Sequence, residues 1–169
     1  MYRLIVVMTA ALAAGLGGAA CAADAEHPAH HPMGPAEVAA PKPEAVKDDR
    51  QLVKYPNALR IQTLANMRDH LQTMGNIQAA LASGGFDKAS ELAEQRLGMS
   101  SLEAHGAHEV AKFMPKGMQD AGTAMHHTAS QFALVAKDAS ATGDLKPVLA
   151  ALSKLNQTCV ACHAGYRLR

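Results

Sequence analysis

The last eleven residues of the chain read Cys159-Val160-Ala161-Cys162-His163-Ala164-Gly165-Tyr166-Arg167-Leu168-Arg169. Two cysteines are separated by two residues, and a histidine directly follows the second. On a helix this spacing places the thiols about one turn apart, where each can add across one vinyl group of a haem. The histidine then lies beneath the porphyrin, where a ring nitrogen can bind iron. Cys-x-x-Cys-His is the attachment motif of c-type haem. The sequence therefore predicts one covalently bound haem c on Cys159 and Cys162, with His163 as the proximal iron ligand.

A Cys-x-x-Cys pair also occurs in redox dithiols and in zinc sites. A thioredoxin-like dithiol opens a helix after a strand in a mixed fold, whereas this pair lies near the end of a chain with helical periodicity. A structural zinc ion needs about four ligands, usually from a second Cys or His pair, and the sequence offers no second Cys-x-x-Cys pair. The adjacent histidine favours haem attachment.

The residues before the motif have the period of a helix. Apolar residues recur at steps of three and four, and both cysteines fall on their stripe: Val148, Leu152, Leu155, Cys159, Cys162 and Tyr166. Asp144 is the expected N-cap, with Pro147 in the first turn. A haem on these cysteines would face the protein interior.

Three more helices are expected before this one. The first runs from about Tyr55 to Ser83-Gly84-Gly85, with an apolar stripe of Leu64, Met67, Leu71, Met74, Ile77 and Leu81. The second is capped by Asp87 and ends at Gly98, with Ala89, Leu92, Ala93 and Leu97 on one face. A further helical segment is expected from Ser100 or Ser101 to about Phe113, followed by a turn at Met114-Pro115. The third helix runs from about Met118 to Ser140, with the stripe Gly122, Met125, Ala129, Phe132 and Ala136. No segment has the period of a strand, so we expect an all-α, antiparallel four-helix bundle over residues 51–169, with the haem between its helices.

Residues 1–23 have the pattern of an export signal. Arg3 supplies a positive start, an apolar run follows from Leu4 to about Leu16, and Ala20-Cys21-Ala22 fits a cleavage site. A periplasmic location follows, which agrees with haem attachment outside the cytoplasm. Cys21 also lies in a sequence similar to a bacterial lipobox, but the usual leucine three residues earlier is missing. We favour removal of Cys21 with the signal; lipidation would anchor the protein to a membrane.

Residues 24–50 are rich in proline and show no apolar period, which is typical of a disordered linker. This linker holds a cluster of metal-binding side chains, His27, His30, His31 and Met33. Such a cluster could bind copper, and a periplasmic copper-handling protein is therefore one alternative function. The prolines argue against a preformed site, so we favour a simple tether.

The C-terminal sequence Cys-x-x-Cys-His-x-x-Tyr-Arg, formed by Cys159, Cys162, His163, Tyr166 and Arg167, resembles that of the cytochrome c prime family, the class II cytochromes c. The resemblance implies a four-helix bundle, often a homodimer. In that family, high-spin members leave the distal haem face open and bind gases such as nitric oxide. Low-spin members place a methionine of the first helix on the iron and transfer electrons.

The stretch Asn66-Met67-Arg68-Asp69-His70 resembles the region that carries this methionine in the low-spin branch, which implies Met67 as the distal ligand. Met67 also lies on the predicted inward stripe, although most methionines at helical spacing only fill a core. His70 is the alternative ligand, followed by Met74 one turn further on, and an open site or another ligand is the remaining option. For Arg167 we expect a contact with a haem propionate.

Net charge near zero gives no support for a nucleic-acid partner. No catalytic triad, phosphate loop or carboxylate pair is recognisable, so we do not expect an enzyme. The expected function is electron transfer between periplasmic redox proteins, and gas binding at an open distal face is the alternative. Four further histidines are expected on the surface: His105, His108, His126 and His127.

Overall fold

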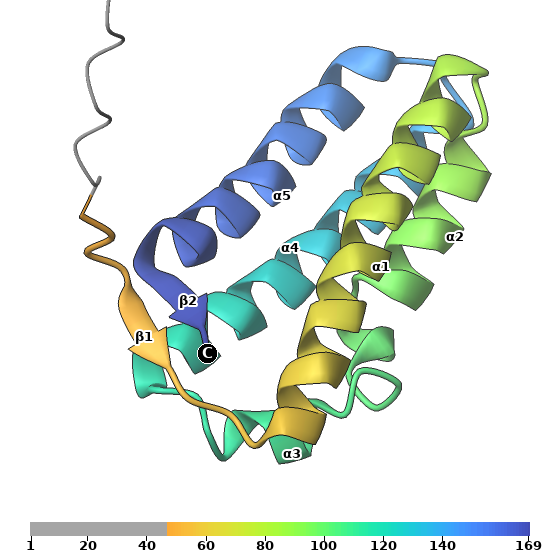
Figure 1. Ribbon diagram of the computed structural model, residues 1–169. Coiled ribbons are helices and arrows are strands. Elements are labelled where there is room, and N and C mark those ends of the chain that lie inside the picture. Colours follow the sequence, from red (N-terminus) through yellow and green to blue (C-terminus); the bar gives the residue numbers. More distant parts are fainter. Residues whose placement is uncertain (1–46) are drawn as a thin grey trace, which may run out of the picture. The chain divides into compact units, whose positions relative to one another are not determined.

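A computed structural model of the chain describes residues 47–169 (Figure 1). Most of these residues are helical, in α1 (Asn57–Ala82), α2 (Phe86–Arg96), α3 (Ala107–Ala111), α4 (Lys116–Ala139) and α5 (Leu145–Gly165). A 3-10 turn (Met99–Ser101) and two three-residue strands, β1 (Gln51–Val53) and β2 (Tyr166–Leu168), complete the described part. The all-α prediction is confirmed. The predicted export signal, Cys21 and the cluster from His27 to Met33 lie outside the described residues.

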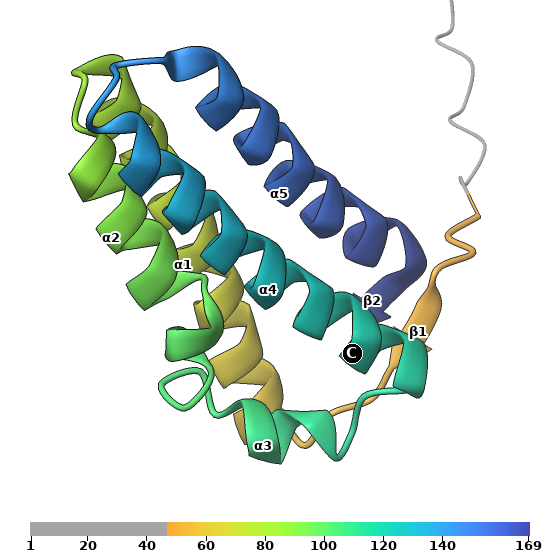
Figure 2. The same cartoon turned by 180° about the vertical axis from the view of Figure 1, so that it is seen from behind.

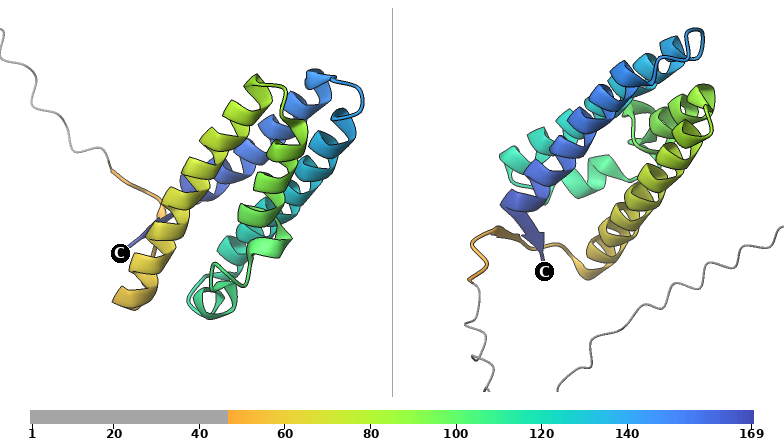
Figure 3. Two further views of the ribbon diagram at one scale, coloured as in Figure 1. Left: turned by 90° about the vertical axis from the view of Figure 1, so that its right-hand side faces the viewer. Right: turned by 90° about the horizontal axis from the view of Figure 1, so that it is seen from above.

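The four long helices pack in series, α1 on α2, α2 on α4, and α4 on α5. Consecutive long helices run in opposite directions (Figures 1 and 2). The first and last members of this series, α1 and α5, stand apart from each other along most of their length in Figures 1 and 3. The strands join the ends of this series, because β1 precedes α1 and β2 follows α5.

The main core is formed by the second half of α1 together with α2, α4 and α5. Its fully buried side chains include Phe132 of α4 and Val148 and Leu155 of α5. Small residues alternate with them, since Ala89, Ala93, Ala129 and Ala136 are also buried. Alanine at these positions lets the helix axes approach, and the large side chains fill the remaining space. The stripes predicted for α4 and α5 are confirmed up to Leu155.

The stripe predicted for α1 is wrong at Leu71, whose side chain is 75% exposed. Met74, Ile77 and Leu81 are buried as expected, and so are the polar residues Thr63 and Thr73. The inward face of α1 therefore includes polar residues, Thr63 and Thr73, beside its apolar ones. Counting only apolar residues cannot find such a face.

β1 and β2 form a parallel pair with the register Gln51↔Tyr166, Leu52↔Arg167 and Val53↔Leu168. The backbone N–H of Arg169 extends the pair by donating to the Val53 carbonyl at 3.1 Å. The predictions of no strand and of a last helix reaching Tyr166 are wrong, because the chain becomes extended after Gly165. Three residues are too few to show a strand period in the sequence.

The segment between α2 and α4 is less regular than predicted. The expected helix from Ser100 to Phe113 is replaced by the 3-10 turn, a loop and the short α3. Gly106 interrupts it with a φ of +65°, a conformation that glycine adopts without a steric penalty. The turn at Met114-Pro115 is confirmed. Asp87 is not an N-cap, since α2 begins at Phe86.

The start of α5 agrees with the sequence. The Asp144 side chain accepts a hydrogen bond from the backbone N–H of Lys146 at 3.0 Å, which caps the helix. None of the helices formed by residues 47–169 has both the length and the apolar character needed to cross a membrane.

Candidate functional site

The two cysteines of the Cys-x-x-Cys-His motif lie in the last two turns of α5. Both are half-buried and neither forms a disulfide. They continue the buried face of Leu152 and Leu155, and Cys159 packs against the main core. The Cys159 Sγ donates a long hydrogen bond of 3.6 Å to the Leu155 carbonyl. Burial raises the pKa of both thiols, so they are protonated at neutral pH.

Cys162 packs against a second, smaller cluster near the strands. Its buried members are Val53, Tyr55, Val110 and Met118, and Tyr166 packs against them from the end of α5. Burial raises the pKa of Tyr55 to about 12. The Tyr166 hydroxyl lies against Gly117, where a Cβ would approach it to 2.5 Å. Tyr166 therefore packs against the protein at the end of α5.

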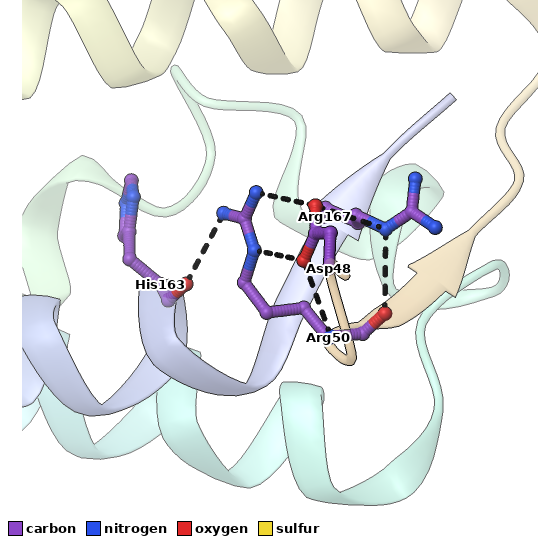
Figure 4. A network of polar contacts seen from close by, with 4 residues as sticks. All are labelled: Asp48, Arg50, His163 and Arg167. Atoms are coloured by element: carbon purple, nitrogen blue, oxygen red, sulfur yellow. Dashed lines mark hydrogen bonds and ion pairs between the residues drawn. The ribbon is translucent and has the colours of Figure 1, made fainter. Parts of the chain in front are cut away.

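His163 is exposed at the end of α5. Its carbonyl accepts a hydrogen bond from Arg50 Nη1 at 3.4 Å, but its imidazole projects from the helix outside this polar network (Figure 4). No hydrogen bond of the ring to any residue of 47–169 is present. The ring nitrogens are therefore available to a ligand.

Arg167 belongs to a polar network that joins the two ends of the described chain (Figure 4). Arg50 pairs with both carboxylate oxygens of Asp48 at 2.9 Å. Arg167 Nε lies 3.3 Å from Asp48 Oδ2 and donates to the Arg50 carbonyl at 3.4 Å. The hydrogen bond from Arg50 is the main cause that lowers the pKa of Asp48 to about 2. Arg167 thus has protein partners, and its contact with a propionate stays a prediction.

Met67 lines a hollow of about 180 Å³ beside the first half of α1. The rest of the lining comes from α1, from the segment around α3 and from the first half of α4, and it includes Thr63, His70, His105, Val110, Met114 and His126. Met67 is half-buried there. No residue of α5 belongs to this lining, so the structure does not bring Met67 and His163 to one shared cavity.

Three histidines converge at one side of this hollow: His70 of α1, His105 of the loop before α3, and His126 of α4. Their ring centroids lie 4.7 Å (70–105), 5.8 Å (105–126) and 6.1 Å (70–126) apart. The surface prediction is wrong for His126, which is buried, and for His105, which is half-buried; it is confirmed for His108 and His127. The spacing of His126 from Gly122 and Ala129, four and three residues away, is the signal that could have placed it inside.

The residues of the motif have the chemistry that covalent haem attachment requires. Two unpaired thiols one turn apart face the interior, and a histidine with an unengaged ring follows them. Thr63 Oγ1, which belongs to the hollow beside α1, is buried with no hydrogen-bond partner among residues 47–169, although most buried polar atoms have one. The donor set of the motif fits a covalently attached haem, whereas the hollow that contains Thr63 is lined by no residue of α5.

A scan against protein-family models, a search of curated proteins and a search of solved structures found no match for this chain.

Proposed function

We propose that this protein is an exported, monohaem c-type cytochrome of the cytochrome c prime kind, which carries electrons between periplasmic redox proteins. In this proposal α1, α2, α4 and α5 form a four-helix bundle around a haem attached to Cys159 and Cys162. One observation carries the proposal: the two thiols of a Cys-x-x-Cys-His motif lie unpaired on the inward face of α5. A c-type haem is the cofactor that uses all three motif residues.

The haem would supply a one-electron couple between Fe(III) and Fe(II). His163 would be its proximal ligand, and the exposed, unengaged imidazole supports this role. The apolar side chains around Cys159 and Cys162 would exclude water from the cofactor. A low-polarity setting is one of the means by which proteins tune a haem potential.

Met67 is the distal ligand that we propose. Its thioether lines the hollow beside the orphaned Thr63 hydroxyl. His70 lines the same hollow, but its Nε2 lies 3.5 Å from His105 Nδ1, so this imidazole has a neighbour that competes for it. Methionine and histidine together favour Fe(II) and raise the reduction potential, which suits an electron carrier.

The absorption spectrum of the reduced protein, recorded with and without carbon monoxide, tests the proposal. We expect a six-coordinate, low-spin spectrum that carbon monoxide does not change. Met67→Ala should open the distal position and permit carbon monoxide binding. Met74→Ala is the matched control, since Met74 is buried on the same helix two turns further on and should leave the spectrum unchanged.

Two results would redirect the proposal. Immediate carbon monoxide binding by the unaltered protein would indicate an open distal face and a gas-binding function. A low-spin spectrum that survives Met67→Ala but is lost in His70→Ala would make His70 the ligand.

A further inference from the structure

We propose that His70, His105 and His126, called here the histidine cluster, bind a divalent transition-metal ion that prefers imidazole, such as Zn²⁺ or Cu²⁺. The site borders the same hollow as Met67, but its ligands differ from Met67 and His163, the proposed ligands of the haem iron, and it does not depend on the proposed haem. Imidazole nitrogen is a good ligand for both ions. The site would join α1, the loop before α3, and α4.

The strongest geometric support is the pair His70 and His105. Their facing nitrogens, Nε2 of His70 and Nδ1 of His105, are 3.5 Å apart. Two nitrogens bound to one tetrahedral zinc ion at about 2.0–2.1 Å are separated by roughly 3.3–3.4 Å. The observed separation is therefore close to that of a ligand pair. As a hydrogen bond it is at the weak limit, so this contact alone does not explain why the rings meet.

His126 has one ring nitrogen engaged by the protein, which leaves the other for a metal ion. Its Nδ1 lies 2.7 Å from the Leu97 carbonyl, to which it can only donate, and 3.4 Å from the Ser101 hydroxyl. The proton is therefore on Nδ1, and the lone pair is on Nε2 at the far side of the ring. Metal-bound histidines are commonly oriented by a backbone carbonyl in this way.

The three rings are close to the spacing that one ion requires. Rings bound to a tetrahedral ion have centroids roughly 5 Å apart, given metal–nitrogen bonds of about 2 Å. The distances here are 4.7, 5.8 and 6.1 Å. Within residues 47–169, no group of three His, Cys, Asp or Glu side chains is placed closely enough to hold a metal ion without movement. Binding therefore requires His126 to approach the other two rings by about an ångström, and the hollow that all three rings line leaves room for this.

The surroundings of the histidine cluster favour neutral imidazoles, the form that binds a metal cation. Burial lowers the pKa of all three histidines, that of His70 to about 4, so each ring is neutral at neutral pH and carries one lone pair. Asn66 Nδ2 donates to the His105 carbonyl at 2.9 Å and thereby fixes the loop against α1. Asp69 lies near the cluster and is paired with Arg96.

Zinc binding to the haem-loaded, full-length protein tests this proposal. The histidines of the N-terminal segment, His27, His30 and His31, are first replaced by Asn so that they do not compete. Equilibrium dialysis against Zn²⁺, followed by elemental analysis, then gives stoichiometry and affinity. We expect one zinc ion per chain.

Single substitutions in that background assign the ligands. His105→Asn and His126→Asn should each weaken zinc binding at least about 100-fold, since even the loss of an outer-shell partner costs about 10–100-fold. In His126→Asn the side-chain amide can still donate to the Leu97 carbonyl, which preserves the fold while removing the ligand nitrogen. The exposed neighbours provide matched controls, and His108→Asn and His127→Asn should leave the affinity unchanged.

The proposal is overturned if zinc does not bind, or if His126→Asn binds it as tightly as the parent protein. Circular dichroism establishes that each variant is folded. If the purified protein carries no haem, the same titration is made on the Cys159→Ser/Cys162→Ser chain, so that free thiols do not hold zinc. The haem proposal and the zinc proposal can thus fail separately.

Discussion

The inward orientation of α5 can be tested by truncating Leu155. This side chain is fully buried and lies one turn before Cys159, so it shares the face that carries the thiols. Leu→Ala removes three carbons, worth about 0.8 kcal/mol each in transfer free energy, and leaves a cavity in addition. We therefore expect Leu155→Ala to lower the free energy of unfolding by about 3 kcal/mol, within the range of about 2.7–5 kcal/mol measured for such changes.

The assay is urea denaturation followed by far-ultraviolet circular dichroism, with both variants in the same haem state. Leu149→Ala is the matched control on the same helix, because the Leu149 side chain is 49% exposed. It should cost less than about 1 kcal/mol. In thermal unfolding, Leu155→Ala should lower Tm by roughly 10 °C. Equal effects of the two variants would refute the orientation of α5, and with it the interior position of Cys159 and Cys162.

Three further predictions concern the cluster, a cap and a turn. In metal-free protein kept in chelator, the pKa of His70 is lower in the folded chain than in the unfolded chain. On acidification, His70 is therefore protonated in the unfolded chain at a higher pH than in the folded chain. The contribution of neutral His70 to the free energy of unfolding is therefore full above about pH 6.5 and lost towards pH 4, on the order of 3 kcal/mol in all. Urea unfolding at pH 7, 5.5 and 4 should show this fall in the free energy of unfolding, and His70→Asn should make the fall smaller. Asp144→Ala removes the cap of α5 and should lower the unfolding free energy by about 1 kcal/mol, whereas an unchanged urea midpoint would contradict the capping role. Gly106→Ala forces a φ of +65° on alanine and brings its Cβ to 2.6 Å from the Gln62 side chain, so it should lower the free energy of unfolding by at least about 1 kcal/mol. Gly143→Ala has a similar φ but open space around the Cβ, so its smaller loss measures the cost of the backbone conformation alone.

Much of the fold could be predicted from the sequence because the helices that form the main core bury apolar residues at regular spacing. Phe132 and Leu155 are examples, and both are fully buried. The same counting failed at Leu71, because the first half of α1 turns polar residues such as Thr63 inward. β1 and β2 could not be found, since pairing of residues more than a hundred positions apart leaves no local signal.

The candidate site divides in the same way. The motif at Cys159, Cys162 and His163 is local, so its residues and their helical face could be predicted. The histidine cluster could not, because it depends on where α2 ends. The Leu97 carbonyl at the end of α2 gives the buried His126 a polar partner, and only the packing of α2 on α4 brings the two together. Burial of a histidine is favourable only with such a partner.

Covalent haem attachment is the central claim, and the intact mass of the mature protein tests it most directly. The protein is produced in a host that attaches c-type haem and is measured under denaturing conditions, beside a Cys159→Ala/Cys162→Ala control. We expect the mass of the polypeptide plus one haem, with no thiol at Cys159 or Cys162 left to react with an alkylating reagent, and no added haem in the control. A polypeptide without haem, with both thiols free to be alkylated, would contradict it.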